Sequence, residues 1–207
     1  LEVNVAEKYV LVEPNVTMKA LIQATLKHGL IPPVVMELRS ITVGGAIQGG
    51  AGESSSFKYG PFHEHSLAYE VLLGDGSVVN VSPEENRDIF TGLPCTYGTI
   101  GVITLAKIRL IPAKPFVHLT YHRVASFDEC LAYMKEKMEM AIDFVDAIMW
   151  EKGNGVVMTG TFSDRVSDLP QTSFLRPWDE WFYIHAGRIT KRYTHYEELI
   201  PLTDYCF

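Results

Sequence analysis

The stretch that decides the fold runs from Thr42 to Gly60 and reads TVGGAIQGGAGESSSFKYG. Five of its first 15 residues are glycines, and hydroxyl side chains follow them. Glycine lets another group approach the backbone closely, and free backbone amides can converge on a phosphate. The stretch therefore predicts a loop that binds a pyrophosphate cofactor. A glycine-rich surface turn without a ligand is the alternative.

Two common nucleotide-binding motifs do not fit this stretch. It contains Gly50-x-Gly52, but Ser55 stands where the third glycine of a dinucleotide fingerprint is expected, and no long helix pattern follows at once. A Walker A loop needs Gly-Lys-Ser/Thr, and no lysine precedes Lys58 here. Nucleoside triphosphate chemistry is therefore not supported.

The residues around this stretch predict a mixed α/β environment. Apolar residues at helical spacing indicate a helix from Met18 to Leu26, with Thr17 as its N-cap and Gly29 beyond its end. Other patterns predict a strand at Tyr9 to Val12, a hairpin of Leu67 to Leu73 and Ser77 to Val81, a helix at Pro83 to Phe90 opened by Ser82, and one or two strands in Gly101 to Ile111.

A domain boundary is expected near Ala113, between Pro112 and Pro115. After it, the sequence predicts the order strand, helix, strand, strand, at Phe116 to His122, Phe127 to Met140, Phe144 to Trp150 and Gly155 to Phe162. This order is typical of an α+β domain, and we expect its further partner strands to lie beyond Phe207.

Composition narrows the classes of function. The 207 residues are 47% hydrophobic and carry a net charge of −7, which favours a packed globular protein over a nucleic-acid binder held by a basic surface. Three cysteines far apart favour a reducing compartment over a disulfide framework, and no apolar run reaches the ~20 residues that span a bilayer. The chain begins at Leu1 with a strand already in progress, so we expect that N-terminal sequence is missing.

Three runs together resemble one family. They are TVGGAIQGGAGESSSFKYG (Thr42 to Gly60), LAYEVLLGDGSVV (Leu67 to Val79) and YGTIGVITLAKIRLIPAK (Tyr97 to Lys114), and VEPNVTM, VVMTGTF, RPW and YEELIPL extend the likeness. They resemble the vanillyl-alcohol-oxidase type of FAD-linked oxidoreductase, with its PCMH-type FAD-binding domain, and most closely the delta-24-sterol reductase (diminuto-like) family. The resemblance implies the C-terminal half of that domain at residues 1–113, then the start of an α+β cap or substrate domain at 114–207.

The resemblance also implies a cofactor site for non-covalent FAD. In that family the TVGG loop lies against the flavin and its diphosphate, and the GVIT segment lines the cofactor too. The residues so implied are Thr42, Val43, Gly44, Gly45, Gln48, Gly49, Gly52, Glu53, Ser54, Gly101 and Ile103.

The activity implied by the resemblance is reduction of a sterol side-chain double bond in sterol biosynthesis. NADPH would reduce the flavin, which would pass hydride to one alkene carbon while an acid protonates the other; no residue of this sequence identifies that acid. The resemblance places the whole protein at the endoplasmic reticulum membrane, held there through the missing N-terminal sequence. An FAD-dependent oxidase or dehydrogenase of alcohols or lactones, and a non-catalytic subunit that keeps the fold, are the alternatives.

Several other side chains are candidates for function. Lys58 could neutralise a phosphate and Tyr59 could reach the cofactor edge, but solvation and packing are the ordinary roles of such residues. Two histidine pairs, His63 with His65 and His118 with His122, have no further ligand at diagnostic spacing, so no metal site is expected.

The stretch from Phe174 to Tyr183 is strongly aromatic, with Trp178, Trp181, Phe182 and His185 at helical spacing. It predicts mainly core packing, with a sterol pocket or a membrane interface as alternatives. The basic residues Arg188, Lys191 and Arg192 are interpreted as a solvated helix face, with a dinucleotide phosphate or a lipid headgroup as the other possible partner.

Overall fold

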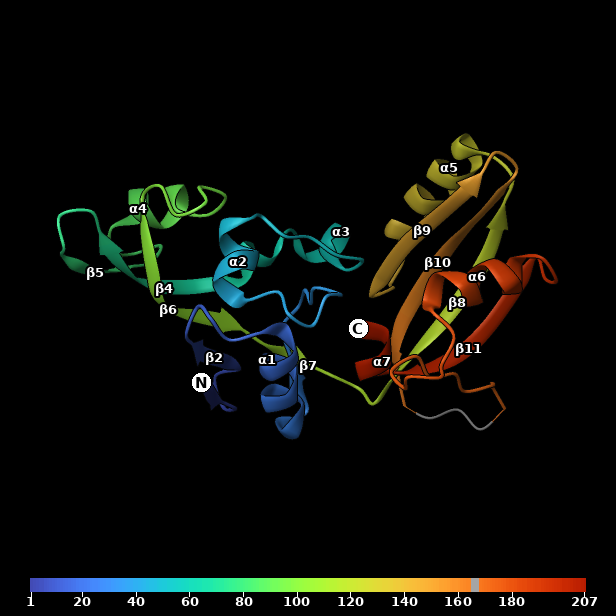
Figure 1. The fold of residues 1–207 in the computed structure, drawn as a ribbon, viewed down its shortest axis with the longest axis horizontal. Coiled ribbons are helices and arrows are strands. Elements are labelled where there is room, and N and C mark those ends of the chain that lie inside the picture. Colours follow the sequence, from blue (N-terminus) through green and yellow to red (C-terminus); the bar gives the residue numbers. More distant parts are fainter. Residues whose placement is uncertain (165–167) are drawn as a thin grey trace. The chain divides into compact units, whose positions relative to one another are not determined.

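The computed structural model describes residues 1–164 and 168–207 (Figure 1). Two compact units make up the chain: an N-terminal unit, Leu1–Ala113, and a C-terminal unit, Lys114–Phe207. Both contain antiparallel sheet and helices, which confirms the predicted α+β class. In the described residues, no helix is both long enough and apolar enough to cross a bilayer.

The N-terminal unit is built on a five-stranded antiparallel sheet in the order β1-β2-β6-β4-β5. Its strands are β1 (Glu2–Asn4), β2 (Tyr9–Val12), β6 (Gly101–Arg109), β4 (Ser66–Leu73) and β5 (Val78–Val81), and β3 (Leu30–Ile31) pairs separately with β7 (Ile111–Pro112). The predicted hairpin of β4 and β5 is confirmed, with Gly76 at φ 87° in its turn. There the Oδ1 atom of Asp75 accepts a hydrogen bond from the amide of Ser77 at 2.9 Å.

The unit also contains short helices: α1 (Met18–Thr25), α2 (Val43–Gln48), α3 (Ser56–Tyr59) and α4 (Arg87–Gly92), with 3₁₀ turns η1 (Leu26–His28) and η2 (Phe62–His65). Helix α1 confirms its prediction, because the hydroxyl of Thr17 caps it and Gly29 follows in the left-handed region at φ 66°. Its buried side chains follow the predicted helical spacing.

The predicted helix at Pro83 to Phe90 is wrong by one turn. The hydroxyl of Ser82 accepts hydrogen bonds from the amides of Glu84 and Glu85, both at 3.1 Å, but this closes a turn and does not open a helix. Asn86 then takes a left-handed conformation, φ 49°, which interrupts any helix. Helix α4 begins only at Arg87.

The C-terminal unit is a four-stranded antiparallel sheet in the order β11-β8-β10-β9. Its elements are β8 (Phe116–Val124), α5 (Phe127–Met138), β9 (Phe144–Glu151), β10 (Asn154–Ser163), α6 (Phe182–Thr190), β11 (His195–Pro201) and α7 (Leu202–Cys206). The predicted order of strand, helix and two strands is confirmed. One further partner strand lies within the chain, because β11 pairs with β8; partner strands beyond Phe207 stay an expectation.

Helices cover both faces of this second sheet. His122 of β8 stacks on Tyr133 of α5 at a centroid distance of 4.0 Å, whereas the next residue back, Tyr121, contacts Phe182 of α6. Adjacent strand residues point to opposite faces, so α5 and α6 lie on opposite sides of β8. The α6 face holds the core cluster of Leu119, Tyr121, Val156, Met158, Ala186, Ile189 and Ile200.

A glycine lets α6 lie close to the sheet. A Cβ atom on Gly187 would come within 3.3 Å of the indole ring of Trp150, which belongs to β9 and packs against the core cluster. A larger residue would therefore require the indole ring of Trp150 to shift by a few tenths of an ångström.

Truncation of a core side chain should separate buried from exposed positions. Ile200 is fully buried in the cluster, so Ile200→Ala should lower the unfolding free energy by about 2–5 kcal/mol, measured by urea denaturation. Ile184, on the outer side of α6, is 46% exposed, and Ile184→Ala should change it by less than about 0.5 kcal/mol. Equal losses in the two variants would contradict this description of the core.

Candidate functional site

The glycine stretch forms a helix where a loop was predicted. Helix α2 begins after Thr42, whose Oγ1 atom accepts a hydrogen bond from the amide of Gly45 at 3.2 Å. The N-cap and the compact residues after it outweigh the low helix propensity of the two glycines. The helix ends at Gln48, and Gly50 follows in a left-handed conformation at φ 64°.

The expectation that this first turn offers free amides to a phosphate is wrong. The amide of Val43 donates to the carbonyl of Val16 at 2.9 Å, and that of Gly44 donates to the carbonyl of Pro14 at 2.8 Å. Together with the Thr42 cap on Gly45, these bonds use the first three amides of α2 within the chain. The residues remain predicted cofactor contacts, but contact there must be made by other atoms.

The glycines of this segment serve two different purposes. A Cβ atom on Gly44 would lie 2.7 Å from the Cβ atom of Pro14, so Gly44 is required for packing within the chain. Gly45, Gly49 and Gly52 are instead exposed. The first two are four residues apart and so lie on one side of α2 and its end. We call these three residues the glycine strip, a stretch of accessible backbone against which a flat ring can lie.

A turn that precedes the predicted cofactor contacts Gly101 and Ile103 packs against the end of α2. Its amides at Cys95 and Tyr97 donate to the carbonyls of Ile47 and Gln48, at 3.3 Å and 3.4 Å. The Oε1 atom of Gln48 also accepts from the hydroxyl of Thr96 at 3.0 Å and from the amide of Gly98 at 3.1 Å. These bonds join two segments that are about 50 residues apart in sequence.

The same turn has a strained backbone. Cys95 and Tyr97 have positive φ angles of 64° and 54°, which are uncommon for residues other than glycine. The side chain of Tyr97 is 82% exposed. Strained backbone and an exposed aromatic ring beside an open strip are typical of ligand sites. Sequence reasoning gave neither residue a role, although Tyr97 begins the YGTIG run and Cys95 lies two residues before it.

One polar atom at this junction tests whether FAD fits. The Nε2 atom of Gln48 is buried and has no hydrogen-bond partner among the described residues, whereas the Oε1 atom of the same amide accepts two hydrogen bonds. A buried donor without an acceptor is destabilising, and a carbonyl of a bound ring would satisfy it. The exposed glycine strip and this donor therefore fit a flavin at α2.

The remaining predicted contacts of the cofactor site lie outside α2. Glu53 accepts the amide of Ser54 on its Oε2 atom at 2.9 Å, so these two residues form a local turn. Gly101 and Ile103 begin β6 and are buried in the sheet. A Cβ atom on Gly101 would lie 2.7 Å from the Cγ1 atom of Val71, which gives this glycine a packing role. Their contact with a cofactor stays a prediction.

The nearby candidates from the sequence have ordinary partners. Lys58 lies 5.3 Å from the ring centroid of Tyr59, and that ring meets the buried His65 edge to face. Burial, and secondly the charge of Arg109, lower the pKa of His65. His63 lies 3.9 Å from the thiol of Cys95. Across the described residues, histidine, cysteine and acidic side chains nowhere gather in a group of three that could hold a metal ion.

A second polar cluster lies inside the C-terminal unit, on the α6 face of the sheet. Glu198 of β11 is fully buried, yet it is a carboxylate. Its Oε1 atom accepts from the hydroxyl of Tyr121 at 2.6 Å and from the Nε2 atom of His185 at 2.8 Å, and the hydroxyl of Thr172 donates to its Oε2 atom. Burial and the charge of Glu198 raise the pKa of Tyr121. The three donors satisfy a charge that would otherwise be strongly destabilising.

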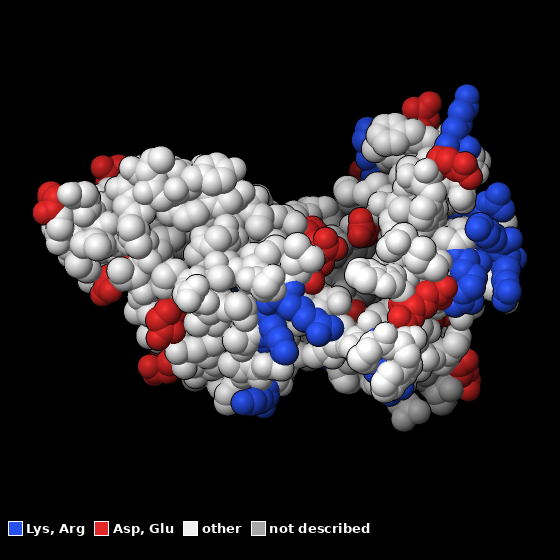
Figure 2. All heavy atoms as spheres, in the orientation of Figure 1, with Lys and Arg blue, Asp and Glu red and all other residues white. Residues whose placement is uncertain are grey.

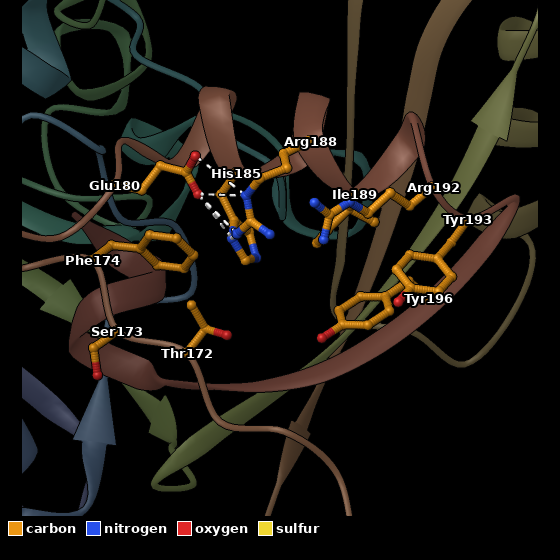
Figure 3. A pocket seen from close by; sticks show the side chains of 10 residues that line it. All are labelled: Thr172, Ser173, Phe174, Glu180, His185, Arg188, Ile189, Arg192, Tyr193 and Tyr196. Atoms are coloured by element: carbon orange, nitrogen blue, oxygen red, sulfur yellow. Dashed lines mark hydrogen bonds and ion pairs between the residues drawn. The ribbon is translucent and has the colours of Figure 1, made fainter.

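The other ring nitrogen of His185 faces an ion pair (Figure 3). Its Nδ1 atom lies 3.0 Å from the NH2 atom of Arg188 and 3.5 Å from the Oε2 atom of Glu180. Arg188 also contacts both carboxylate oxygens of Glu180, at 2.9 Å for the shortest pair. Hydrogen bonds from Arg188 lower the pKa of Glu180.

These residues line a pocket of about 320 Å³. Figure 3 shows the His185, Glu180 and Arg188 group toward one end and the rings of Tyr193 and Tyr196 at the other. The tyrosine rings are stacked, with centroids 5.3 Å apart. The full lining is Thr172, Ser173, Phe174, Glu180, His185, Arg188, Ile189, Arg192, Tyr193 and Tyr196.

Most of the aromatic stretch does not pack in the core. Trp178 and Trp181 are 76% and 77% exposed, so the interpretation as core is wrong for both. Both precede α6, although Phe174, earlier in the same stretch, does pack against the core cluster. Phe182 does pack against the core cluster, and His185 is buried.

The other polar side chains of this unit have partners or lie in solvent. His118 bonds Glu197 at 2.8 Å. Arg188, Lys191 and Arg192 are exposed, and Figure 2 shows Lys and Arg side chains gathered on the C-terminal unit where α6 leads into β11.

Sequence reasoning predicted no role for Glu198 or Glu180. The only signal in the sequence that could have marked Glu198 is a charged residue beside Leu199 in a stretch that forms a strand.

Comparison with known proteins defines the class. Residues 1–82 match the model of the FAD binding domain family, in agreement with the glycine strip and the unsatisfied donor beside it. Residues 1–82 therefore carry the pattern of an FAD binding domain of the PCMH type, which confirms the resemblance seen in the sequence motifs.

Within that class the similarity extends to sterol reductases. The chain is 37% identical over 206 residues to the Delta(24)-sterol reductase of Macaca fascicularis and 33% identical over 218 residues to that of Arabidopsis thaliana, in each case over 99% of this chain. It spans 40% and 39% of those two relatives. Cytokinin dehydrogenase 7 of Oryza sativa subsp. japonica is 34% identical over 60% of this chain.

A substitution in the glycine strip should separate cofactor binding from folding. Gly45→Leu places a bulky side chain on the exposed side of α2, so we expect the protein made from the complete gene to lose its bound flavin, measured by absorbance per mole of protein. The unfolding temperature without flavin should change little. The control is Gly74→Leu in the β4–β5 turn, where a Cβ atom meets nothing within 4 Å. Normal flavin content in Gly45→Leu would place the cofactor elsewhere.

Neighbouring glutamates on β11 should differ in their effect on stability. Glu198→Ala leaves three donors, two of them buried, without their acceptor, so we expect the unfolding free energy to fall by about 3–5 kcal/mol in urea denaturation. The side chain of Glu197 is 38% exposed, and Glu197→Ala should lower it by about 1 kcal/mol or less. A small loss in Glu198→Ala would mean that the buried network does not support the fold.

Proposed function

We propose that the whole protein is an FAD-dependent enzyme that reduces a side-chain double bond of a sterol, with NADPH as the reductant. The observation that carries this proposal is the extent of the similarity to Delta(24)-sterol reductases. It covers 99% of the chain, including the C-terminal unit, whereas the FAD binding domain match ends at residue 82. The function of this class depends on the domain beyond the cofactor domain, so similarity there bears on the substrate.

The two units would have different roles, cofactor binding in the N-terminal unit and substrate binding in the C-terminal unit. Bound FAD would supply the chemistry of accepting and donating a hydride. The glycine strip and the amide of Gln48 would hold the flavin in the N-terminal unit; the exposure of Gly45 and Gly49 and the unsatisfied Nε2 atom of Gln48 support this role. The C-terminal unit would bind the lipid substrate and keep water from the reacting atoms.

We also propose that the whole protein works at the endoplasmic reticulum membrane, where an insoluble sterol substrate is available. The motif resemblance to sterol reductases supports this location. Fractionation of cells that express the complete gene tests it, and recovery of the protein with the membrane fraction is the expected result.

The proposed reaction is tested in two half-reactions. The purified protein from the complete gene should be yellow, and NADPH should bleach its flavin absorbance under anaerobic conditions. A sterol with an unsaturated side chain should then restore that absorbance, whereas the saturated sterol should not.

Other outcomes would favour the alternatives. An oxidase or dehydrogenase would leave NADPH unused and would be bleached by an alcohol or a lactone, as the shared cofactor domain allows. Well-folded protein without any flavin would overturn the proposal and indicate a non-catalytic subunit.

A further inference from the structure

We propose that one surface of the C-terminal unit docks directly on an anionic lipid bilayer. We call it the α6 surface, and it consists of the exposed residues Trp178, Trp181, Ile184, Lys191 and Arg192. All of them belong to one unit of the chain. The inference goes beyond the proposed function, because neither FAD nor a sterol takes part in this contact.

Two exposed indole rings mark one end of the α6 surface. Trp178 and Trp181 are more than three-quarters exposed, although tryptophan side chains are highly buried on average. The backbone that carries them is hydrogen-bonded. The amide of Asp179 donates to the carbonyl of Arg176 at 3.0 Å, and the amide of Ile184 donates to the carbonyl of Trp181 at 3.0 Å. A folded segment therefore presents both rings to solvent.

The helix that follows has two different sides. His185 and Ile189 belong to its buried side, which faces the sheet. Ile184 lies three residues after Trp181, and Lys191 lies about two turns after Ile184, so these exposed residues follow one other side of the helix. The outer side of α6 therefore joins the aromatic end of the surface to a basic end.

The charge of this segment differs from that of the whole chain. From Arg176 to Arg192 it contains four basic and two acidic residues, whereas the net charge of the chain is −7. Arg188 pairs with Glu180 at 2.9 Å, but Lys191 and Arg192 form no ion pair with any described residue. An acidic protein with one basic segment approaches an anionic surface with that segment first.

A bilayer is the partner whose chemistry matches both ends of the surface. Tryptophan is enriched at the boundary between membrane and water, because its ring is apolar and its N–H group is polar. Basic side chains beside such rings attract anionic headgroups. A nucleic acid would match Lys191 and Arg192, but it offers no apolar layer to Ile184.

Helix α5, on the opposite face of the same sheet, provides a comparison. It also exposes apolar side chains, among them Phe127 and Leu131. From Phe127 to Met140, however, the chain contains four acidic and two basic residues, so an anionic bilayer would repel this helix. Helix α5 therefore supplies matched controls for substitutions on the α6 surface.

The central experiment measures binding of the full 207-residue chain to lipid vesicles by flotation. Vesicles of equimolar phosphatidylcholine and phosphatidylserine should bind the chain at least about tenfold more tightly than vesicles of phosphatidylcholine alone. Lys191→Glu should weaken this binding at least about tenfold, because one basic residue near an anionic surface contributes roughly fivefold and the substitution adds a repulsive charge. The matched control Lys135→Glu, at an exposed position of α5, should change it less than about twofold, since distant charges are screened.

The indole rings are tested by substitution and by fluorescence. The double variant Trp178→Ser with Trp181→Ser should bind the mixed vesicles at least about tenfold more weakly, because binding scales with the apolar area that enters the bilayer. Phe127→Ser should bind like the wild type. Emission of the wild type should shift to shorter wavelength on binding. The double variant should show no shift, because Trp150 is already packed against the core cluster.

A second measurement uses the protein made from the complete gene, in which any other membrane contact would mask that of the α6 surface in a binding assay. Hydroxyl-radical labelling followed by mass spectrometry reports the accessibility of each ring. Oxidation of Trp178 and Trp181 should be at least about twofold lower in the mixed vesicles than in phosphatidylcholine vesicles, because both rings enter the interface. Oxidation of Phe127 should be the same in both.

Three results would overturn the inference. The first is equal affinity of the chain for the two kinds of vesicle. The second is an equal effect of Lys191→Glu and Lys135→Glu, or unchanged binding of the double tryptophan variant. The third is protection of Trp178 and Trp181 in the complete protein without anionic lipid, which would mean that another protein surface covers them.

The proposed function stands or falls on a different measurement. Bleaching of the flavin by NADPH needs none of the substituted residues. Colourless protein that still binds the mixed vesicles would therefore overturn the proposed function and leave this inference intact, whereas active protein with no preference for anionic vesicles would do the reverse.

Discussion

The attachment of α2 to the chain before α1 determines which side of this helix is open. The amides of Val43 and Gly44 donate to the carbonyls of Val16 and Pro14, and the missing side chain of Gly44 lets Pro14 pack at van der Waals distance. This side of α2 is therefore closed by the protein itself. The exposed side carries Gly45, whose backbone is accessible beside the cap of Thr42, so those two hydrogen bonds determine which side of the helix stays open.

The turn from Pro94 to Gly98 completes this arrangement. Its bonds to the carbonyls and side chain of α2 need Cys95 and Tyr97 in left-handed conformations, which are unfavourable in isolation. The bonds to Gln48 offset that strain in part, and they leave one end of its amide buried without a partner. Backbone strain together with an unsatisfied buried donor is typical of a ligand-binding site without its ligand.

Sequence patterns could predict those elements that local rules control. Thr17 and Gly29 delimit α1, the Asp-Gly turn joins β4 to β5, and alternation marks β6 and β8. The predictions that were wrong also have local causes, in backbone conformation and helix capping. Asn86 in a left-handed conformation delays α4, and the cap of Thr42 makes a helix of a glycine-rich segment. Neither effect can be read from hydrophobic periodicity.

The candidate sites could be predicted only in part for a related reason. The glycines of α2 stand out in the sequence, but which of them contacts Pro14 depends on tertiary packing. Strand β11 was missed because its polar residues, Glu197 and Glu198, obscure its pattern; only the pairing with β8 puts one toward solvent and the other in the core. A buried carboxylate is identified by its partners, and these lie 13 to 77 residues away.

The placement of the indole rings makes the two units distinguishable by optical spectroscopy. All three tryptophans of the chain, Trp150, Trp178 and Trp181, belong to the C-terminal unit. The side chain of Trp150, on β9, packs against α6, while those of Trp178 and Trp181 are exposed to water. Their fluorescence therefore reports on the C-terminal unit alone. The emission of Trp150 should shift to longer wavelength when that unit unfolds, whereas Trp178 and Trp181 already emit at long wavelength in the folded state.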